Sequence, residues 1–216
     1  MLTLVVILLL SYLCGSLAFS LWAGLLLRGV DLRTVGSGNL GATNVLRALG
    51  WKAAVPVLLL DVGKGVIPVA LIAHLRLGHD PLPFGMTPFW ISLLAGVAAI
   101  AGHMWTPFAR FRGGKGVATA TGVFAAVAPF PTLCSFLLFG LVTALSRFVS
   151  LGSIVAALAL VPLLVFLHPR QAPLLPLLVI AVPLVSLIVW KHRVNIARLR
   201  AGTESKLGGA PCQDRL

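Results

Sequence analysis

The sequence has few charged residues, and very few acidic ones. Only 10% of its 216 residues are charged, and Asp and Glu together number five. Soluble domains carry about 25% charged residues, so this content argues against an ordinary soluble protein. Scattered carboxyl groups also argue against Mg²⁺-dependent phosphotransfer and against the paired carboxylates of a glycosidase. We therefore expect no metal site and no cofactor.

Cysteine and tyrosine are scarce as well. Cys14, Cys134 and Cys212 lie far apart with no paired spacing, which argues against disulfides and metal ligation. The net charge of +12 could suggest a nucleic-acid partner, but there is one tyrosine and the basic residues sit between apolar runs. Basic cytoplasmic loops of a membrane protein explain this distribution better. We expect no nucleic-acid partner, and the sequence gives no indication of an oligomeric state.

Apolar runs dominate what is present. The chain is 59% hydrophobic with a mean hydropathy of +1.04, which predicts an all-α integral membrane protein. A helix needs roughly 17–25 apolar residues to cross the membrane. Residues 2–27 form the first such run, and no cation precedes Arg28, unlike in a cleaved signal peptide. We expect a retained first span with the N-terminus outside and Arg28 in the cytoplasm.

The remaining apolar runs predict further spans at residues 53–75, 88–108, 153–167 and 174–190. The run at residues 117–145 is long for one span and short for two, and Pro129 and Pro131 interrupt it. As a single helix it would place Arg147 and the basic residues 191–200 outside, against the positive-inside rule. As a hairpin that turns at the prolines, it keeps both in the cytoplasm.

The hairpin gives about seven transmembrane helices in one polytopic domain, residues 1–216, with residues 193–216 as a cytoplasmic C-terminal tail. Only Arg76 and Arg170 then lie outside, and Lys64 lies within the membrane. A five-span alternative with re-entrant segments has the same parity. Short spans beside the hairpin predict short or broken helices around a site on the cytoplasmic side.

Three polar clusters interrupt the apolar runs. They are the first cluster (residues 36–47), the glycine loop (residues 112–116) and the last cluster (residues 191–198). All three fall on the cytoplasmic side in both span models. Polar side chains that cannot lie in lipid must meet water or one another, so the clusters could form one anion-binding site.

The glycine loop, Arg-Gly-Gly-Lys-Gly, is expected to start a helix. Its glycines would let backbone N–H groups approach an anion, the helix N-terminus adds partial positive charge, and Lys115 adds a full one. The spacing is not that of a Walker A loop. The alternative interpretation is a flexible loop whose cations only set the topology.

The first cluster offers more hydroxyl and amide groups than a helix cap needs. Four such residues fall within eight positions before a predicted short helix that carries Arg47, a side chain suited to bidentate phosphate contact. A cap and a turn are the simpler alternative. The candidate phosphate-binding residues of these two segments are Ser37, Gly38, Asn39, Gly41, Thr43, Asn44, Arg47, Gly113, Gly114 and Gly116.

In the last cluster, His192, Asn195 and Arg198 recur every third residue and would share one helix face. His192 could serve as a general base or acid, although a structural role is the alternative. Glu204 is expected to pair with Lys206 near the surface.

Two further pairs stand near these clusters. Asp61 and Lys64 lie three apart within the second span, where we expect an intrahelical ion pair with a structural role. Ser150 and Ser153 lie at the start of the sixth span, either as helix caps or at the same depth as Lys115. Together the clusters predict a cationic, amide-rich pocket whose ligand is an anion, most simply phosphate, with a membrane-resident partner.

These residues resemble a known family. Ser37-Gly-Asn-Leu-Gly-Ala-Thr-Asn44, Gly102-His103 followed by Phe111-Arg-Gly-Gly-Lys-Gly-Val117, and His192-Arg-Val-Asn195 leading to Gly202-Thr-Glu-Ser-Lys206 look like the three signature motifs of the bacterial acyl-phosphate:glycerol-3-phosphate acyltransferases, the PlsY family. The resemblance covers essentially the whole chain.

The resemblance implies the first acylation of phospholipid synthesis in the bacterial inner membrane, with the site facing the cytoplasm. An acyl phosphate would donate its acyl group to the 1-hydroxyl of sn-glycerol 3-phosphate, giving lysophosphatidic acid, a membrane lipid, and inorganic phosphate without a metal. Catalytic roles would fall to Lys115, Ser153, His192 and Asn195. Arg198 and Glu204 would join the substrate-binding residues.

Two other classes remain open from the residues alone. A small organic-anion or phosphate transporter also uses half-helices and glycine loops, although no inverted repeat or polar outer path is evident. A membrane lipid phosphatase would need a nucleophilic histidine or grouped acidic residues.

Overall fold

The structure, a computed structural model, describes residues 1–77, 85–168 and 173–208. Arg170, Cys212 and the tail beyond residue 208 lie outside this part of the chain. The described residues form α-helices and short 3₁₀ turns, with no strand among them. The helices are α1 (Leu2–Ser16), α2 (Phe19–Arg28), α3 (Ala42–Leu49), α4 (Trp51–Ala70), α5 (Pro88–Met104), α6 (Val117–Val127), α7 (Pro129–Ser146), α8 (Val149–Leu167), α9 (Leu174–Lys191) and α10 (Arg193–Arg200).

The predicted all-α membrane fold is confirmed. Within the described ranges, six helical segments are long and apolar enough to cross a membrane: Leu2–Arg28, Trp51–His74, Pro88–Ala109, Pro129–Ser146, Val149–Leu167 and Leu174–Lys191. The apolar helix α6 is shorter: it has 11 residues and is about 16 Å long, roughly half the hydrocarbon thickness. The run at residues 117–145 divides at the prolines as predicted, because α6 ends at Val127 and α7 begins at Pro129. The orientation of the spans stays a prediction.

The first span is broken rather than continuous. Helix α1 ends at Ser16 and α2 begins at Phe19, so carbonyl groups at the break lose their helical partners. Thr106 Oγ1 donates to the carbonyl oxygen of Ser16 at 2.6 Å, and Lys64 Nζ donates to that of Leu17 at 2.7 Å. Since an unsatisfied carbonyl in lipid costs several kcal/mol, these two side chains stabilise the break.

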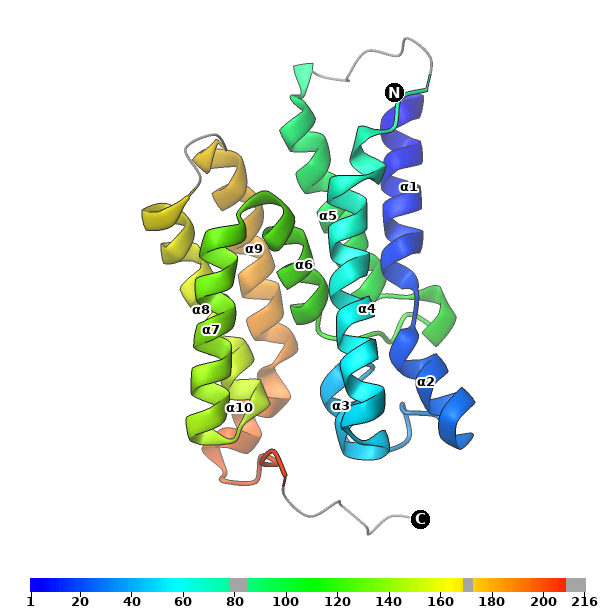
Figure 1. Ribbon diagram of the computed structural model, residues 1–216, viewed down its shortest axis with the longest axis vertical. Coiled ribbons are helices and arrows are strands. Elements are labelled where there is room, and N and C mark those ends of the chain that lie inside the picture. The colour runs from blue at the N-terminus through cyan, green and yellow to red at the C-terminus, as the bar shows by residue number, and fades with distance from the viewer. Residues whose placement is uncertain (78–84, 169–172, 209–216) are drawn as a thin grey trace. The chain divides into compact units, whose positions relative to one another are not determined.

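Contacts divide the chain into two compact units, Met1–Val127 (unit 1) and Ala128–Leu216 (unit 2). In unit 1, α1, α4, α5 and α6 run side by side, and α3 lies at the lower end of α4 (Figure 1). In unit 2, α8 packs against both α7 and α9.

Glycines let the helices of unit 1 approach closely. A Cβ on Gly65 of α4 would overlap the carbonyl oxygen of Thr119 in α6, and one on Gly122 would overlap that of Val62. Small residues at such crossings are how membrane helices gain close packing. The outward surface is apolar, and Leu26, Leu145 and Phe166 are each about 80% exposed, as lipid-facing side chains are (84%, 79% and 81%).

Replacing Gly65 by Ala should destabilise unit 1. The added methyl group meets backbone that has no rotamer to change, so we expect a loss of about 1–3 kcal/mol or more. Gly63→Ala, on the same helix, is the matched control, because a Cβ at Gly63 meets nothing within 4 Å. Thermal unfolding in detergent measures both, and equal melting temperatures would contradict the packing role of Gly65.

Candidate functional site

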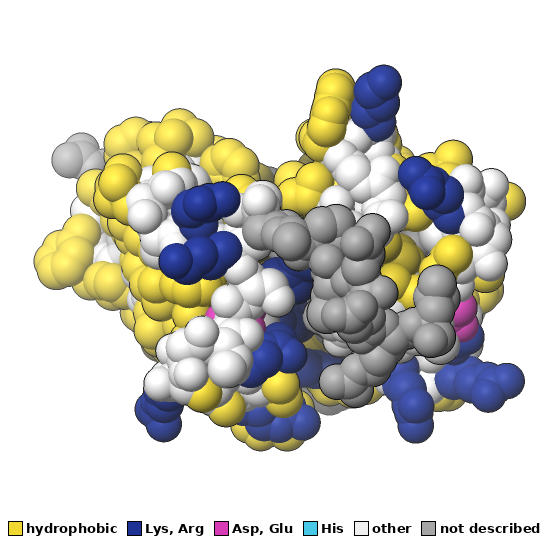
Figure 2. Space-filling view, turned by 90° about the horizontal axis from the view of Figure 1, so that it is seen from below, with side chains coloured by type: hydrophobic (Ala, Val, Ile, Leu, Met, Phe, Trp, Pro, Cys, Tyr) yellow, Lys and Arg dark blue, Asp and Glu magenta, His cyan; other side chains and the backbone are white. Residues whose placement is uncertain are grey.

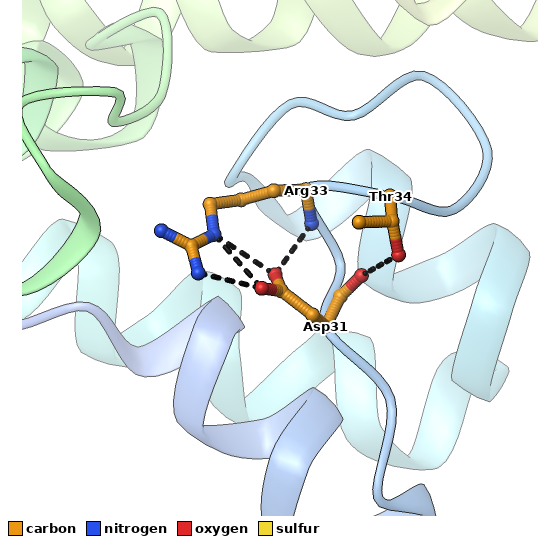
Figure 3. Close-up of polar contacts among 3 residues, drawn as sticks. All are labelled: Asp31, Arg33 and Thr34. Atoms are coloured by element: carbon orange, nitrogen blue, oxygen red, sulfur yellow. Dashed lines mark hydrogen bonds and ion pairs between the residues drawn. The ribbon is translucent and has the colours of Figure 1, made fainter.

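An ion pair shapes the turn that leads into the first cluster. Arg33 donates from its backbone and side chain to the carboxylate of Asp31, with Nη2 2.6 Å from Oδ2, and Thr34 Oγ1 donates to the Asp31 carbonyl (Figure 3). The hydrogen bonds from Arg33 hold the pKa of Asp31 below its usual value. Both side chains are about one-third exposed, so this pair contributes to turn geometry more than to stability.

Asn44 organises the loop of the first cluster. Its amide nitrogen donates to the carbonyl oxygens of Leu32 and Val35, and its Oδ1 accepts from the N–H of Ser37, each at 3.0 Å. The side chain is only 1% exposed, and Gly36 at φ +63° has no Cβ that would overlap Oδ1. These bonds use both amide protons, so Asn44 holds the loop in shape rather than offering donors to a ligand.

The other polar residues of the first cluster face outward more. Ser37 is exposed, and Asn39, Thr43 and Arg47 are half-buried. Arg47 lies on α3, so the predicted short helix is confirmed. Helix α3 begins after Gly41 without a side-chain cap, which removes capping as the reason for so many hydroxyl and amide groups.

The glycine loop packs against the end of α5. The N–H groups of Gly113 and Gly114 donate to the carbonyl oxygens of Met104 and His103, both at 3.1 Å. The expectation that these glycine N–H groups approach an anion is therefore wrong, because the end of α5 uses them. The loop's capacity for an anion lies with Lys115, which is half-buried, and with the start of α6 two residues later.

The structure brings the first cluster and the glycine loop together. A Cβ on Gly114 would come within 2.5 Å of the carbonyl oxygen of Leu40, which belongs to the first cluster. This contact forms entirely within unit 1, so two of the three predicted clusters lie against each other. Arg110 and Arg112 beside the loop are exposed. Figure 2 views the molecule from below and shows exposed Lys and Arg side chains on this face.

In unit 2, Glu204 gathers three donors. Its Oε1 accepts from Ser150 Oγ and from Asn195 Nδ2, and its Oε2 accepts from Arg198 Nε, all at 2.7 Å. Burial raises the pKa of Glu204, but these hydrogen bonds outweigh it and hold the pKa below its usual value. The expected surface pair with Lys206 is wrong, since Glu204 is 7% exposed and Lys206 lies over the ring of Phe148.

His192 lies at a break between two helices, not on the helix that carries Asn195 and Arg198, with which it was predicted to share a face. Helix α9 ends at Lys191 and α10 begins at Arg193. The His192 ring is buried, with Nδ1 2.8 Å from the carbonyl oxygen of Ile188. A neutral ring held this way carries its proton on Nδ1, which leaves Nε2 as the basic nitrogen.

The two serines of α8 differ in their partners. Ser153 Oγ donates to the carbonyl oxygen of Val149 within its own helix at 2.9 Å, whereas Ser150 reaches Glu204. Neither side chain caps α8, whose first residue follows Phe148 without a side-chain cap. Gly152 between them allows α8 to approach α7, because a Cβ there would overlap Thr143 Oγ1.

The sequence is similar to a family of known proteins over nearly its whole length. The sequence model of the family described as glycerol-3-phosphate acyltransferase matches residues 5–202. A glycerol-3-phosphate acyltransferase of Chlorobium phaeobacteroides (strain BS1) is 40% identical over 96% of this chain and 97% of its own length. One of Salinibacter ruber (strain DSM 13855 / M31) is 44% identical over 99% and 97%.

Two solved structures are similar over the whole fold. Both are crystal structures of PlsY (YgiH), an integral membrane glycerol 3-phosphate acyltransferase. Its glycerol 3-phosphate form gives a TM-score of 0.80 at 42% identity, covering 95% of this chain and 96% of the other. Its lysophosphatidic acid form gives 0.78 at 41% identity, covering 95% of each. The chain that carries these loops and helices therefore belongs to the glycerol-3-phosphate acyltransferase family.

Proposed function

We propose that this acyltransferase moves a fatty acyl group from acyl phosphate to the 1-hydroxyl of sn-glycerol 3-phosphate, giving lysophosphatidic acid and inorganic phosphate. The observation that carries the proposal is the packing of the first cluster against the glycine loop within unit 1, which places hydroxyl and amide side chains beside segments that carry Arg47 and Lys115. Two phosphate-bearing substrates need two such cations. The PlsY relatives in glycerol 3-phosphate and lysophosphatidic acid forms support the acceptor and the product.

One phosphate group would bind in unit 1. Lys115 supplies the full charge, α6 supplies its N-terminal partial charge, and Ser37 supplies a hydroxyl group. Arg47 helps to hold the other phosphate group. Asn44, together with the contact between Leu40 and Gly114, keeps these segments in place without touching substrate.

Unit 2 would position the reacting groups. Ser153, His192 and Asn195 align the glycerol hydroxyl or polarise the acyl carbonyl group, and Glu204 holds Asn195 and Arg198 in place. The hydroxyl oxygen attacks the carbonyl carbon, and the bond from that carbon to the phosphate oxygen breaks. The hydroxyl proton goes to His192 Nε2 or to a phosphate oxygen. An acyl phosphate is a mixed anhydride that is already activated, so no covalent acyl-enzyme is needed.

The reaction is placed at the cytoplasmic side of the bacterial inner membrane. Glycerol 3-phosphate is a charged, water-soluble molecule, whereas the acyl donor and the lipid product have apolar tails that partition into the bilayer. The basic loops of both units fit this side under the positive-inside rule.

Purified protein tests the donor. Glycerol 3-phosphate is supplied with acyl phosphate, acyl-CoA or acyl-carrier protein, and lysophosphatidic acid is measured. Product from acyl phosphate supports the proposal, and product from the thioesters alone overturns it. Phosphate release separates the other classes, because a transporter releases none and a phosphatase releases it without glycerol 3-phosphate.

Replacing Lys115 by Ala should remove turnover while the protein stays folded. Loss of one charged group that stabilises the departing phosphate lowers kcat by at least about 10²–10³-fold. Lys52→Ala, an exposed lysine in the first turn of α4, is the control and should keep wild-type activity. Substantial activity of the Lys115 variant in the same assay would contradict the role proposed for this residue.

Replacing Glu204 by Gln should destabilise unit 2 at neutral pH by about 1–3 kcal/mol, because Arg198 loses its buried partner. The pKa of Glu204 is lower in the folded state, so its carboxylate stabilises the fold above the unfolded pKa of about 4.3. That contribution is lost as the pH falls through the folded-state pKa.

Melting temperatures of wild type and Glu204→Gln should therefore differ by a constant amount from pH 7 down to about 4.3, and should converge as the pH falls further through the folded-state pKa. The control is Asp31→Asn, which breaks a partly exposed pair worth at most about 1 kcal/mol. A constant difference between wild type and Glu204→Gln at all pH values would argue against an ionised, hydrogen-bonded Glu204.

A further inference from the structure

Three ionisable side chains are buried together beneath the glycine loop, all within unit 1. Asp61 Oδ1 is 2.7 Å from Lys64 Nζ and 3.8 Å from His103 Nδ1. None of the three side chains is more than 6% exposed. The ion pair is the one expected from sequence, but the histidine beside it is not. Ionisable groups within a span are expensive and are usually tied to function.

The structural need for two of these residues is clear. Lys64 donates to the carbonyl oxygen of Leu17 at the break between α1 and α2, and Asp61 balances its charge. This accounts for the pair alone. It gives no reason for His103, a polar ring that an apolar side chain of the same size could replace at the end of α5.

His103 touches the glycine loop in two ways. Its carbonyl oxygen accepts from the N–H of Gly114 at 3.1 Å. Its ring lies against the same residue, since a Cβ on Gly114 would overlap Nε2. A cavity of about 10 Å³ lies beside this contact, lined by residues that include Lys64, His103, Thr106 and Gly114. That volume has room for at most one water molecule.

We propose that Asp61, Lys64 and His103 act as one positioning cluster for the glycine loop. The ring lies between the ion pair and the loop, because Nδ1 is 3.8 Å from Asp61 Oδ1 and Nε2 lies against Gly114. The ring thereby fixes the path of the loop one residue before Lys115. The cluster does not touch substrate, and its effect on turnover rests on the proposed role of Lys115.

Two substitutions at His103 separate a polar role from packing. His103→Leu keeps most of the ring's volume without its nitrogens, and His103→Gln returns a polar group at about the reach of Nε2. Ser92→Ala on the same helix is the matched control, since Ser92 is buried about three turns away from the loop. For each variant, kcat and KM for both substrates are measured with the melting temperature in detergent.

We expect His103→Leu to melt within a few degrees of wild type and to lose about 10–100-fold in kcat. His103→Gln should recover at least about tenfold of that loss, and Ser92→Ala should match wild type. His103→Leu with wild-type kcat overturns the proposal. A loss of kcat that parallels the fall in melting temperature, and that His103→Gln does not restore, also overturns the proposal.

If His103→Leu fails to fold, His103→Met gives the second test, because its flexible apolar chain adapts to the same space and leaves the Asp61–Lys64 pair and the bond from Lys64 to Leu17 in place. A fall of about tenfold or more in kcat with a retained fold supports the cluster, and wild-type kcat overturns it. The wild-type enzyme separates this inference from the proposed acyl donor. If wild type gives no product from acyl phosphate, the proposed donor is wrong, and kcat of each variant is then compared with that of wild type using the thioester that does give product.

Discussion

The hydrogen bonds that satisfy the broken first span are the constraint on which unit 1 depends. Lipid offers no partner to a free carbonyl group, so the break after Ser16 exists only because Thr106 and Lys64 reach it from other segments. Lys64 then needs Asp61, and Asp61 lies beside His103. One local interruption of a helix thus requires a buried ion pair. That pair lies beside His103, which contacts the loop that carries Lys115.

Much of this architecture could be predicted from the sequence. The charge distribution and the apolar runs predicted the spans, and Pro129 and Pro131 predicted where the run at residues 117–145 divides, because proline favours the first turn of a helix. The short helix with Arg47 and the Asp61–Lys64 pair follow from the same local reasoning, since each depends on residues close in sequence.

The contacts that the sequence did not predict join residues far apart in the chain. Nothing local pairs Glu204 with Ser150, 54 positions earlier, and a carboxylate near two basic residues suggests Lys206 as readily as Arg198. The use of the Gly113 and Gly114 N–H groups by α5 depends on where the chain turns after Met104. His103 belonged to a recognised motif, and its closeness to the buried pair emerges only when α4 and α5 are packed.

Glu204 also bears on the order in which the protein is made. Domains generally fold as units during synthesis, with the N-terminal one first. Every donor-acceptor pair named above for unit 1 is complete once α6 has been translated. Ser150, in contrast, stays without its acceptor until α9, α10 and the following turn have been made. Helices α7 and α8 can pack before that, since Ser135 already finds its acceptor at Ala156, but Ser150 depends on water or on the insertion machinery until the chain reaches Glu204.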